Sequence, residues 1–371
     1  MASDDFHEHA FKKHTLLKLE MFEAYTRAWI PVFPASSNVP VQLQIFDLFA
    51  GPGYDIVGIP GSAIRILNAI ALYRTLLVKR ETLIELHFND SNASKLQQLR
   101  VHVEAYICGT PELSEIVSVH WYCEDTEVLL PRLSRTFNSN PSLVFLDQTG
   151  VKHLSKEDIA RMTATKRTDY LMFFASAHVR RLGATSEFAQ YLDVLNVEAI
   201  RKVPYHQTTR EITTQLNKSI PSSSSLRFYP FSMMNGRNIY GLIFAASHLL
   251  AVDKFLKIAW ETNSENGDAN YDIDDESVRR TNLSLFDGVH KPMKREHFES
   301  QVVDEILQGR INNNIDLYEF ALRNGFQGEF AGKIVEEMKG NGQIAFPGRK
   351  SHVNYAAYKN KKRILFQKGS S

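Results

Sequence analysis

Apolar residues recur at helical spacing near the start of the chain and form short continuous runs after it. Between residues 10 and 30, leucines and aromatic residues lie three or four positions apart, which predicts an amphipathic helix. Apolar runs short enough for buried strands follow at residues 41–49, 82–88, 116–121, 143–146 and 170–175. Helical patterns separate these runs, and this alternation predicts a parallel sheet covered on both faces.

The next two apolar runs have a different connection. Residues 226–234 and 239–246 are joined by Asn235-Gly236-Arg237-Asn238, and Asn-Gly between two strands is a strong hairpin signal. A mostly parallel sheet that ends in an antiparallel hairpin is typical of methyltransferase-type Rossmann folds. A helix over residues 248–262 is expected to close this domain, which would span residues 1–262.

The remainder of the chain predicts a second, smaller domain. Residues 263–295 are acidic and poor in aliphatic side chains, which indicates a surface linker with solvated acids. Three short helical patterns and two short apolar segments follow, at residues 299–308, 316–324, 330–339, 343–346 and 353–356. Three helices and a hairpin predict a winged helix-turn-helix domain over residues 296–371.

The charge balance conceals a local basic segment. Lys and Arg total 43 against 42 Asp and Glu, so the formal net charge of +1 provides no global attraction to nucleic acid or membranes. Residues 347–363 nevertheless contain no acid. The candidate nucleic-acid-binding residues in this segment are Arg349, Lys350, Lys361 and Lys362.

Composition excludes several classes of protein. The 371 residues are 43% hydrophobic, which excludes a disordered chain and is enough for two domains. Cys108 and Cys123 are the two cysteines, and their spacing predicts neither a disulfide framework nor a zinc ribbon. We expect a cytoplasmic protein, because the sequence has no secretory signal pattern and no apolar run long enough for a membrane helix. The histidines at positions 7, 9 and 14 are interpreted as surface residues, so no metal is expected.

The segment after the first predicted strand has the features of a cofactor loop. Small residues follow a strand end there, and they let the backbone approach a ligand at the carboxyl edge of the sheet. The loop residues are Asp47, Phe49, Ala50, Gly51, Pro52 and Gly53. The pattern lacks the three glycines of a dinucleotide site, which disfavours NAD.

Acidic residues follow the other predicted strands as well. Asp90 could accept hydrogen bonds from two ribose hydroxyls, Asp125 or its neighbour Glu124 could hold an adenine amino group, and Asp147 would lie near the reacting atom. The alternative for each residue is a helix cap or a solvated loop acid. Four acids at one sheet edge favour the nucleotide interpretation.

Several stretches together resemble the three-Cys-motif partner (TcmP) family. They are Ala28-Trp29-Ile30-Pro31, the segment 45–53 followed by Pro60-Gly61-Ser62, Val144-Phe145-Leu146-Asp147, and the segment 240–248 leading to Ala259-Trp260. The resemblance covers nearly the whole chain. It implies an α/β Rossmann-like class I methyltransferase domain that binds S-adenosylmethionine through the loop residues, Asp90 and Asp125, followed by a winged helix.

The resemblance also implies a partner and a reaction, with one departure. The partner would be a cysteine-motif protein similar to radical S-adenosylmethionine enzymes, often encoded in phage-related settings, which suggests a role in phage defence. Family members usually carry Asp-Pro-Phe-Gly where this chain has Asp147-Gln148-Thr149-Gly150. The Asp147 carboxylate and the Gln148 carbonyl could still orient a target amine, whereas the proline and the aromatic residue are missing.

Two functions therefore remain open. The chain could be a methyltransferase that acts on DNA or RNA, or a non-catalytic scaffold that binds S-adenosylmethionine and docks protein or DNA through its winged helix. Lys18 and His14, one helical turn apart, could reach over the cofactor loop. His178 with Arg180 and Arg181 could meet a phosphate or be an ordinary capped loop. The aromatic residues Phe228, Phe231, Tyr240 and Phe244 are more simply interpreted as core than as a base-stacking platform.

Overall fold

The computed structural model describes residues 10–36, 39, 41–137, 139–147, 155–182, 185, 193–274 and 294–369. The chain divides into two compact units, Met1–His248 and Leu249–Ser371. None of the helices described is both long and apolar enough to cross a lipid bilayer.

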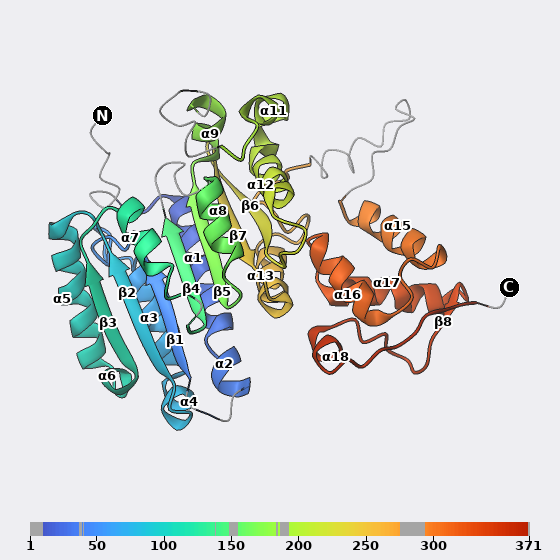
Figure 1. Ribbon diagram of the computed structural model, residues 1–371, viewed down its shortest axis with the longest axis horizontal. Coiled ribbons are helices and arrows are strands. Elements are labelled where there is room, and N and C mark those ends of the chain that lie inside the picture. Colours follow the sequence, from blue (N-terminus) through green and yellow to red (C-terminus); the bar gives the residue numbers. More distant parts are fainter. Residues whose placement is uncertain are drawn as a thin grey trace. The chain divides into compact units, whose positions relative to one another are not determined.

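The first unit is built on a seven-stranded sheet with the order β3-β2-β1-β4-β5-β7-β6 (Figure 1). The strands are β1 (Gln42–Asp47), β2 (Leu83–Asn89), β3 (Val117–Tyr122), β4 (Ser142–Asp147), β5 (Thr168–Phe174), β6 (Arg227–Asn235) and β7 (Asn238–Ala246). The first five are parallel, and β7 is antiparallel to both β5 and β6. This mixed α/β arrangement fits a Rossmann-like methyltransferase fold and confirms the sheet predicted from the apolar runs.

Helices cover both faces of this sheet (Figure 1). On one face, Phe22 of α1 stacks on Phe145 of β4 with ring centroids 3.8 Å apart, and α1 packs on α3. Among the described residues of this unit, the helices are α1 (Lys13–Trp29), α2 (Val32–Ser36), α3 (Ser62–Leu72), α4 (Arg74–Lys79), α5 (Ala93–Gly109), α6 (Leu113–Ile116), α7 (Thr126–Leu133), α8 (Lys156–Thr163), α9 (Ser176–Leu182), α11 (Val197–Lys202), the 3-10 turn η1 (Tyr205–Gln207) and α12 (Thr208–Ser219).

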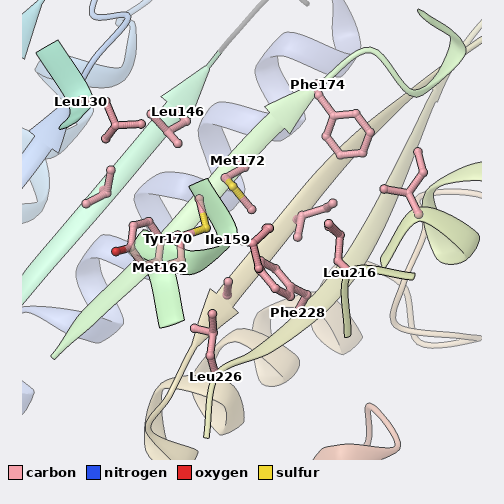
Figure 2. Packing of buried hydrophobic residues seen from close by; sticks show 14 of the residues in the cluster. Leu130, Leu146, Ile159, Met162, Tyr170, Met172, Phe174, Leu216, Leu226 and Phe228 are labelled. Carbon is pink, nitrogen blue, oxygen red and sulfur yellow. The ribbon is translucent and has the colours of Figure 1, made fainter. Parts of the chain in front are cut away.

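The opposite face holds a large apolar cluster. Alternate residues of β4 and β5, among them Leu146, Tyr170 and Met172, pack against Ile159 and Met162 of α8 (Figure 2). Leu216 of α12 and Phe228 of β6 extend the cluster toward the hairpin. Strands buried on both faces read as continuous apolar runs, which explains why the parallel strands could be located from the sequence.

The predicted hairpin is present. Asn235 pairs with Asn238, which leaves Gly236 and Arg237 as a two-residue turn between β6 and β7. Gly236 has a φ of 60°, a left-handed conformation that glycine adopts at little cost. Of the aromatic residues expected in the core, Phe228, Phe231 and Phe244 are buried, whereas Tyr240 is only partly buried.

The second unit contains helices and a small two-stranded sheet. Its elements are α13 (Leu249–Thr262), α15 (Lys294–Leu307), α16 (Asn314–Arg323), α17 (Gly328–Gly340), β8 (Ile344–Ala345), α18 (Tyr355–Lys359) and β9 (Gln367–Lys368). The three predicted helices correspond to α15, α16 and α17. The predicted hairpin between residues 343–346 and 353–356 is wrong, because β8 pairs with β9. The Asn354 side chain instead accepts a hydrogen bond from the N–H of Ala357 and caps α18.

The unit boundary also differs from the expected one at residue 262. Helix α13 belongs to the second unit, where Tyr318 donates to the Asp253 carboxylate at 3.0 Å. The indole N–H of Trp260 donates to the carbonyl of Gly325 at 2.8 Å.

The expected acidic linker is partly folded. Within residues 263–274, Asp268 is buried and lies 3.5 Å from the Lys294 ammonium. Gly267, at φ 64°, lies flat against the ring of Trp260, where a Cβ would come within 2.5 Å of the indole. These acids are therefore not all solvated. The remainder of the expected linker, residues 275–293, lies outside the described residues.

Candidate functional site at the carboxyl edge of the sheet

The acids at the strand ends gather at one edge of the sheet. Asp47 and Asp147 are the last residues of β1 and β4, which are adjacent and parallel, with Asp47 opposite Phe145. Chain order reverses between these two strands, because β2 and β3 lie on one side of β1 whereas β4 and β5 lie on the other. In open α/β sheets, ligands bind at such a switch point, beyond the carboxyl ends of the strands.

Backbone hydrogen bonds shape the loop after β1. Gly51 and Gly53 have φ angles of 62° and 97°, which a residue with a side chain adopts only under strain. The N–H of Gly61 donates to the carbonyl of Gly53 at 2.8 Å. His102 of α5 lies 2.8 Å from the carbonyl of Pro52 through its Nδ1. The loop is thus fixed to the segment before α3 and to α5.

Asp90 holds this loop in place through its side chain. One carboxylate oxygen accepts from the N–H of Gly51 at 3.1 Å, and the other accepts from the N–H of Asn92 at 2.8 Å. A carboxylate offers about four lone-pair sites. Asp90, which is partly exposed, therefore keeps acceptor capacity for a ligand after it has closed the loop.

Asn89 connects three strand ends, a role that the sequence analysis missed. Its amide N–H₂ donates to the carbonyls of Leu48 and Glu124, both at 3.1 Å, and its Oδ1 accepts from the N–H of Glu124. The Thr126 hydroxyl donates to the same Leu48 carbonyl at 3.2 Å. Asn89 is 1% exposed, so these bonds satisfy an amide that would otherwise be buried at a cost.

Asp125 caps the helix that follows β3. Its Oδ1 accepts from the N–H of Glu127 at 2.9 Å, at the amino terminus of α7. The residue is exposed, and its neighbour Glu124 forms an ion pair with Arg132. The cap identified as the alternative for this acid is therefore present, and the other carboxylate oxygen stays available at the sheet edge.

Asp47 is a carboxylate in a strongly perturbed environment. It is fully buried, and burial raises its pKa to about 7. The nearby Ser62 hydroxyl, the Phe49 N–H and Lys18 oppose this shift, whereas the charge of Asp147 adds to it. Its Oδ2 atom has no hydrogen-bond partner among the described residues. Buried polar atoms without partners are uncommon and cluster at functional sites.

Lys18 of α1 reaches the end of β4 and forms an ion pair with Asp147. The lysine side chain is 6% exposed and that of Asp147 is 21% exposed. The Lys18 ammonium also lies 4.5 Å from the ring centroid of Phe173, at the end of β5. From the sequence, Lys18 is expected to reach over the cofactor loop, whereas these contacts lie at the ends of β4 and β5, where it pairs with the candidate catalytic carboxylate Asp147.

His14 lies one helical turn before Lys18, and its ring packs against an aromatic side chain of β7. Its ring stacks on Tyr240 with centroids 4.1 Å apart and an interplanar angle of 2°. Its Nδ1 lies 2.9 Å from the side-chain nitrogen of Asn235. Burial lowers the pKa of His14 to about 4, with the charges of Lys18 and Lys12 adding to the effect, so the ring is neutral near pH 7. His14 is buried rather than a surface histidine.

Other candidate residues lie elsewhere. Gln148 and the two residues after it are outside the described residues, as are His7 and His9. Arg180 donates to the carbonyls of Val203 and Arg201, both at 2.6 Å, so it supports the loop before α12 instead of facing a phosphate. In the second unit, the four candidate basic residues Arg349, Lys350, Lys361 and Lys362 are all exposed. Lys350 lies 3.2 Å from the carboxylate of Glu336.

Comparison with known proteins gives structural likeness only, without a match in sequence. No protein-family model matches the chain, and no curated protein matches it. Among solved structures, a putative O-methyltransferase from Klebsiella pneumoniae is 10% identical with a TM-score of 0.31, covering 64% of this chain and 90% of that one. At this TM-score the likeness carries no argument, and the assignment of a Rossmann-like, methyltransferase-type fold rests on the topology of the sheet itself.

Proposed function

We propose that the first unit binds S-adenosylmethionine at the carboxyl edge of its sheet, as a methyltransferase-like protein. The observation that carries this proposal is the pair of carboxylates, Asp47 and Asp147, on the two strands that flank the switch point. The loop after β1, which contains Gly51 and Gly53 and is called the glycine loop below, and Asp90 lie beside Asp47 on the same edge. The sequence resemblance to the TcmP family, which rests in part on the same loop residues, implies the same cofactor.

The chemistry of the site suits this cofactor. S-adenosylmethionine carries a sulfonium and an ammonium, and this positive charge would favour the ionised form of Asp47, whose pKa is raised to about 7 by burial. Its ribose diol can donate to the unused lone pairs of Asp90, whose position is fixed by the N–H groups of Gly51 and Asn92. Asp125, at the end of β3, has an oxygen available for the adenine amino group. The bound cofactor would supply an activated methyl group.

Calorimetric titration of the full chain with S-adenosylmethionine tests the proposal. We expect saturable binding that Asp90→Ala weakens at least about 100-fold, since each hydrogen bond to a charged group is worth about 1.5–3 kcal/mol. Asp90→Asn keeps an acceptor for the loop but removes the charge, so its affinity for S-adenosylmethionine should lie between those of the wild type and Asp90→Ala. Glu104→Ala, on an exposed position of α5, is the matched control. Absence of binding by the folded wild-type chain would overturn the proposal.

The second unit supplies the reason to propose that the protein acts on or with nucleic acid. Its exposed residues Arg349, Lys350, Lys361 and Lys362 lie in the acid-free segment 347–363. Exposed basic side chains of this kind contact phosphates. We propose that this unit is a winged helix-turn-helix variant, in which β8 and β9 form the wing and α18 lies between these two strands in the sequence. A three-cysteine-motif protein is the proposed partner, on the basis of the family resemblance alone.

One observation favours the alternative of a cofactor-binding scaffold without methyl transfer. The Asp147 carboxylate, which would have to accept from a target amine, is already paired with Lys18. Transfer of labelled methyl groups to DNA or RNA decides between the two functions. Transfer that Asp147→Asn abolishes supports the enzyme, whereas tight cofactor binding without transfer to any nucleic acid supports the scaffold.

A further inference from the structure

A second group of polar residues lies on the sheet itself, away from the carboxyl edge. Glu85 and His87 are two residues apart on β2, so they face the same side of the sheet. His120 lies directly opposite His87 on β3, which is the edge strand. One ligand atom from each of these three residues lies within 4.8 Å of the others. His87, the member of the group nearest to the carboxyl edge on β2, precedes Asn89 by two positions, roughly 7 Å along the strand, and Glu85 lies two positions further from that edge.

His87 is the member that calls for an explanation. It is 6% exposed, and its Nε2 has no hydrogen-bond partner in the described part of the chain. That atom points toward the carboxylate of Glu85, whose Oε2 is 3.8 Å away, beyond hydrogen-bond distance. A buried nitrogen left without a partner has lost its hydrogen bond to water without gaining another, which is unfavourable. A metal ion at this position would remove the cost.

The surrounding residues provide the support that metal ligands usually have. The Nδ1 of His87 lies 3.0 Å from the Tyr122 hydroxyl oxygen, and a ring that donates there presents the Nε2 lone pair to the group. The Gln44 amide donates to the Glu85 carboxylate at 2.8 Å.

We propose that Glu85, His87 and His120 bind a Zn²⁺ ion through two imidazole nitrogens and one carboxylate. Zinc accepts this ligand set at about 2.0–2.2 Å, with a fourth position left to water. The His120 Nε2 lies 4.0 Å from the Glu85 carboxylate, and its side chain is 45% exposed. Donor atoms in a tetrahedral site lie about 3.4 Å apart. The exposed His120 can rotate to close that difference and to turn its ring out of the stack with His87.

Metal binding to the full chain tests the site without reference to any activity. Metal-free protein is titrated with Zn²⁺ against a chromophoric chelator and, separately, with Co²⁺, whose visible absorption reports tetrahedral coordination. We expect one tight site per chain. His120→Ala and Glu85→Gln change partly exposed ligands and should weaken binding by more than the roughly 10–100-fold expected for Tyr122→Phe, which removes a supporting contact.

Control variants distinguish this site from other histidines. His297→Ala changes an exposed histidine of α15. A second control chain carries both His7→Ala and His9→Ala and so lacks the amino-terminal pair of histidines. Both should bind zinc as the wild type does. Circular dichroism of each variant establishes that it is folded. The proposal is overturned if the folded wild type binds no zinc, or if the folded His120→Ala and Glu85→Gln chains bind it unchanged.

Discussion

Lys18 and Asp147 form an ion pair that joins the first helix of the chain to the end of the fourth strand. The two residues are far apart in the sequence, and the pair lies against the ring of Phe173. The lysine is nearly buried. The position of α1 on the sheet and the charge state of the switch point are therefore linked through one contact.

Removal of the lysine charge should destabilise the first unit. Loss of one partner from a buried pair costs about 3–5 kcal/mol, and the partial exposure of Asp147 places Lys18→Met at or below the lower end of that range. Urea unfolding of Lys18→Met, Asp147→Asn and the double variant gives the coupling energy. If the two single effects add to within about 0.5 kcal/mol, the pair contributes no interaction of its own.

The contribution of Asp47 to stability should fall as the pH rises from about 4 to 7, whereas burial of His14 and His87, which lowers their pKa values to about 4, contributes in the opposite direction. Burial raises the pKa of Asp47 from 3.8 to about 7, so in this interval the unfolded chain releases a proton that the folded chain retains. Stability from this group is complete below pH 3.8 and is lost as the pH passes 7, a change of up to roughly 4 kcal/mol. Asp47→Asn removes this contribution, so the unfolding free energy of the wild type minus that of Asp47→Asn should fall as the pH rises through this interval.

A second buried carboxylate provides the matched comparison. Burial also raises the pKa of Asp169 to about 7, and its Oδ2 accepts from the Tyr25 hydroxyl at 2.8 Å. Asp169→Asn should remove a contribution of the same sign as that of Asp47 without weakening the binding of S-adenosylmethionine, because Asp169 lies near the start of β5, at the opposite edge of the sheet. An unchanged dependence of unfolding free energy on pH in both variants would show that neither group titrates in this range.

The glycine loop should tolerate no side chain at Gly53. A Cβ there would meet Leu99 at 3.1 Å and His102 at 3.2 Å, and the φ of 97° is itself unfavourable for alanine. Gly58 has a similar φ of 82° but open space around it. Gly58→Ala should therefore cost only the backbone strain, about 1–2 kcal/mol, whereas Gly53→Ala should cost more and weaken cofactor binding. Calorimetry and thermal unfolding of both variants measure the difference, and equal effects would contradict it.

The basic residues of the second unit should contribute to nucleic-acid affinity through phosphate contacts. Changing Arg349, Lys350, Lys361 and Lys362 together to alanine should lower the slope of log affinity against log salt by up to about 0.9 per lost contact on duplex DNA. The exposed pair Lys79 and Arg80 at the end of α4 provides control substitutions. A slope that stays at the wild-type value would assign the surface to another role.

Much of the fold could be predicted because it depends on local patterns. Strands buried on both faces appear as apolar runs. The Asn235-Gly236 pair predicts a turn because Gly236 adopts the positive φ that this turn requires. The predicted hairpin of the second unit was wrong because residues 353–356 contain apolar residues like a strand, whereas the Asn354 side chain caps a helix there. A strand of two residues such as β9 leaves almost no pattern in the sequence.

The candidate site was only partly predictable, because it depends on contacts between distant residues. The acids at the strand ends could be located from the strands, but the pairing of Lys18 with Asp147 depends on how α1 packs. The stack of His14 on Tyr240 depends on the same packing. The Glu85 and His87 alternation was present in the sequence, yet His120 becomes their neighbour only through the register of β2 and β3.

The Asn89 amide has a mechanical consequence for the site. Its hydrogen bonds fix the carbonyl of Leu48 after β1 and both backbone groups of Glu124 after β3 to the end of β2. A displacement at any one of these three ends is therefore transmitted to the other two. A ligand that touches the loop alone should slow amide hydrogen exchange at Leu48, Asn89 and Glu124 together, so the rim of the sheet responds as a single cooperative element.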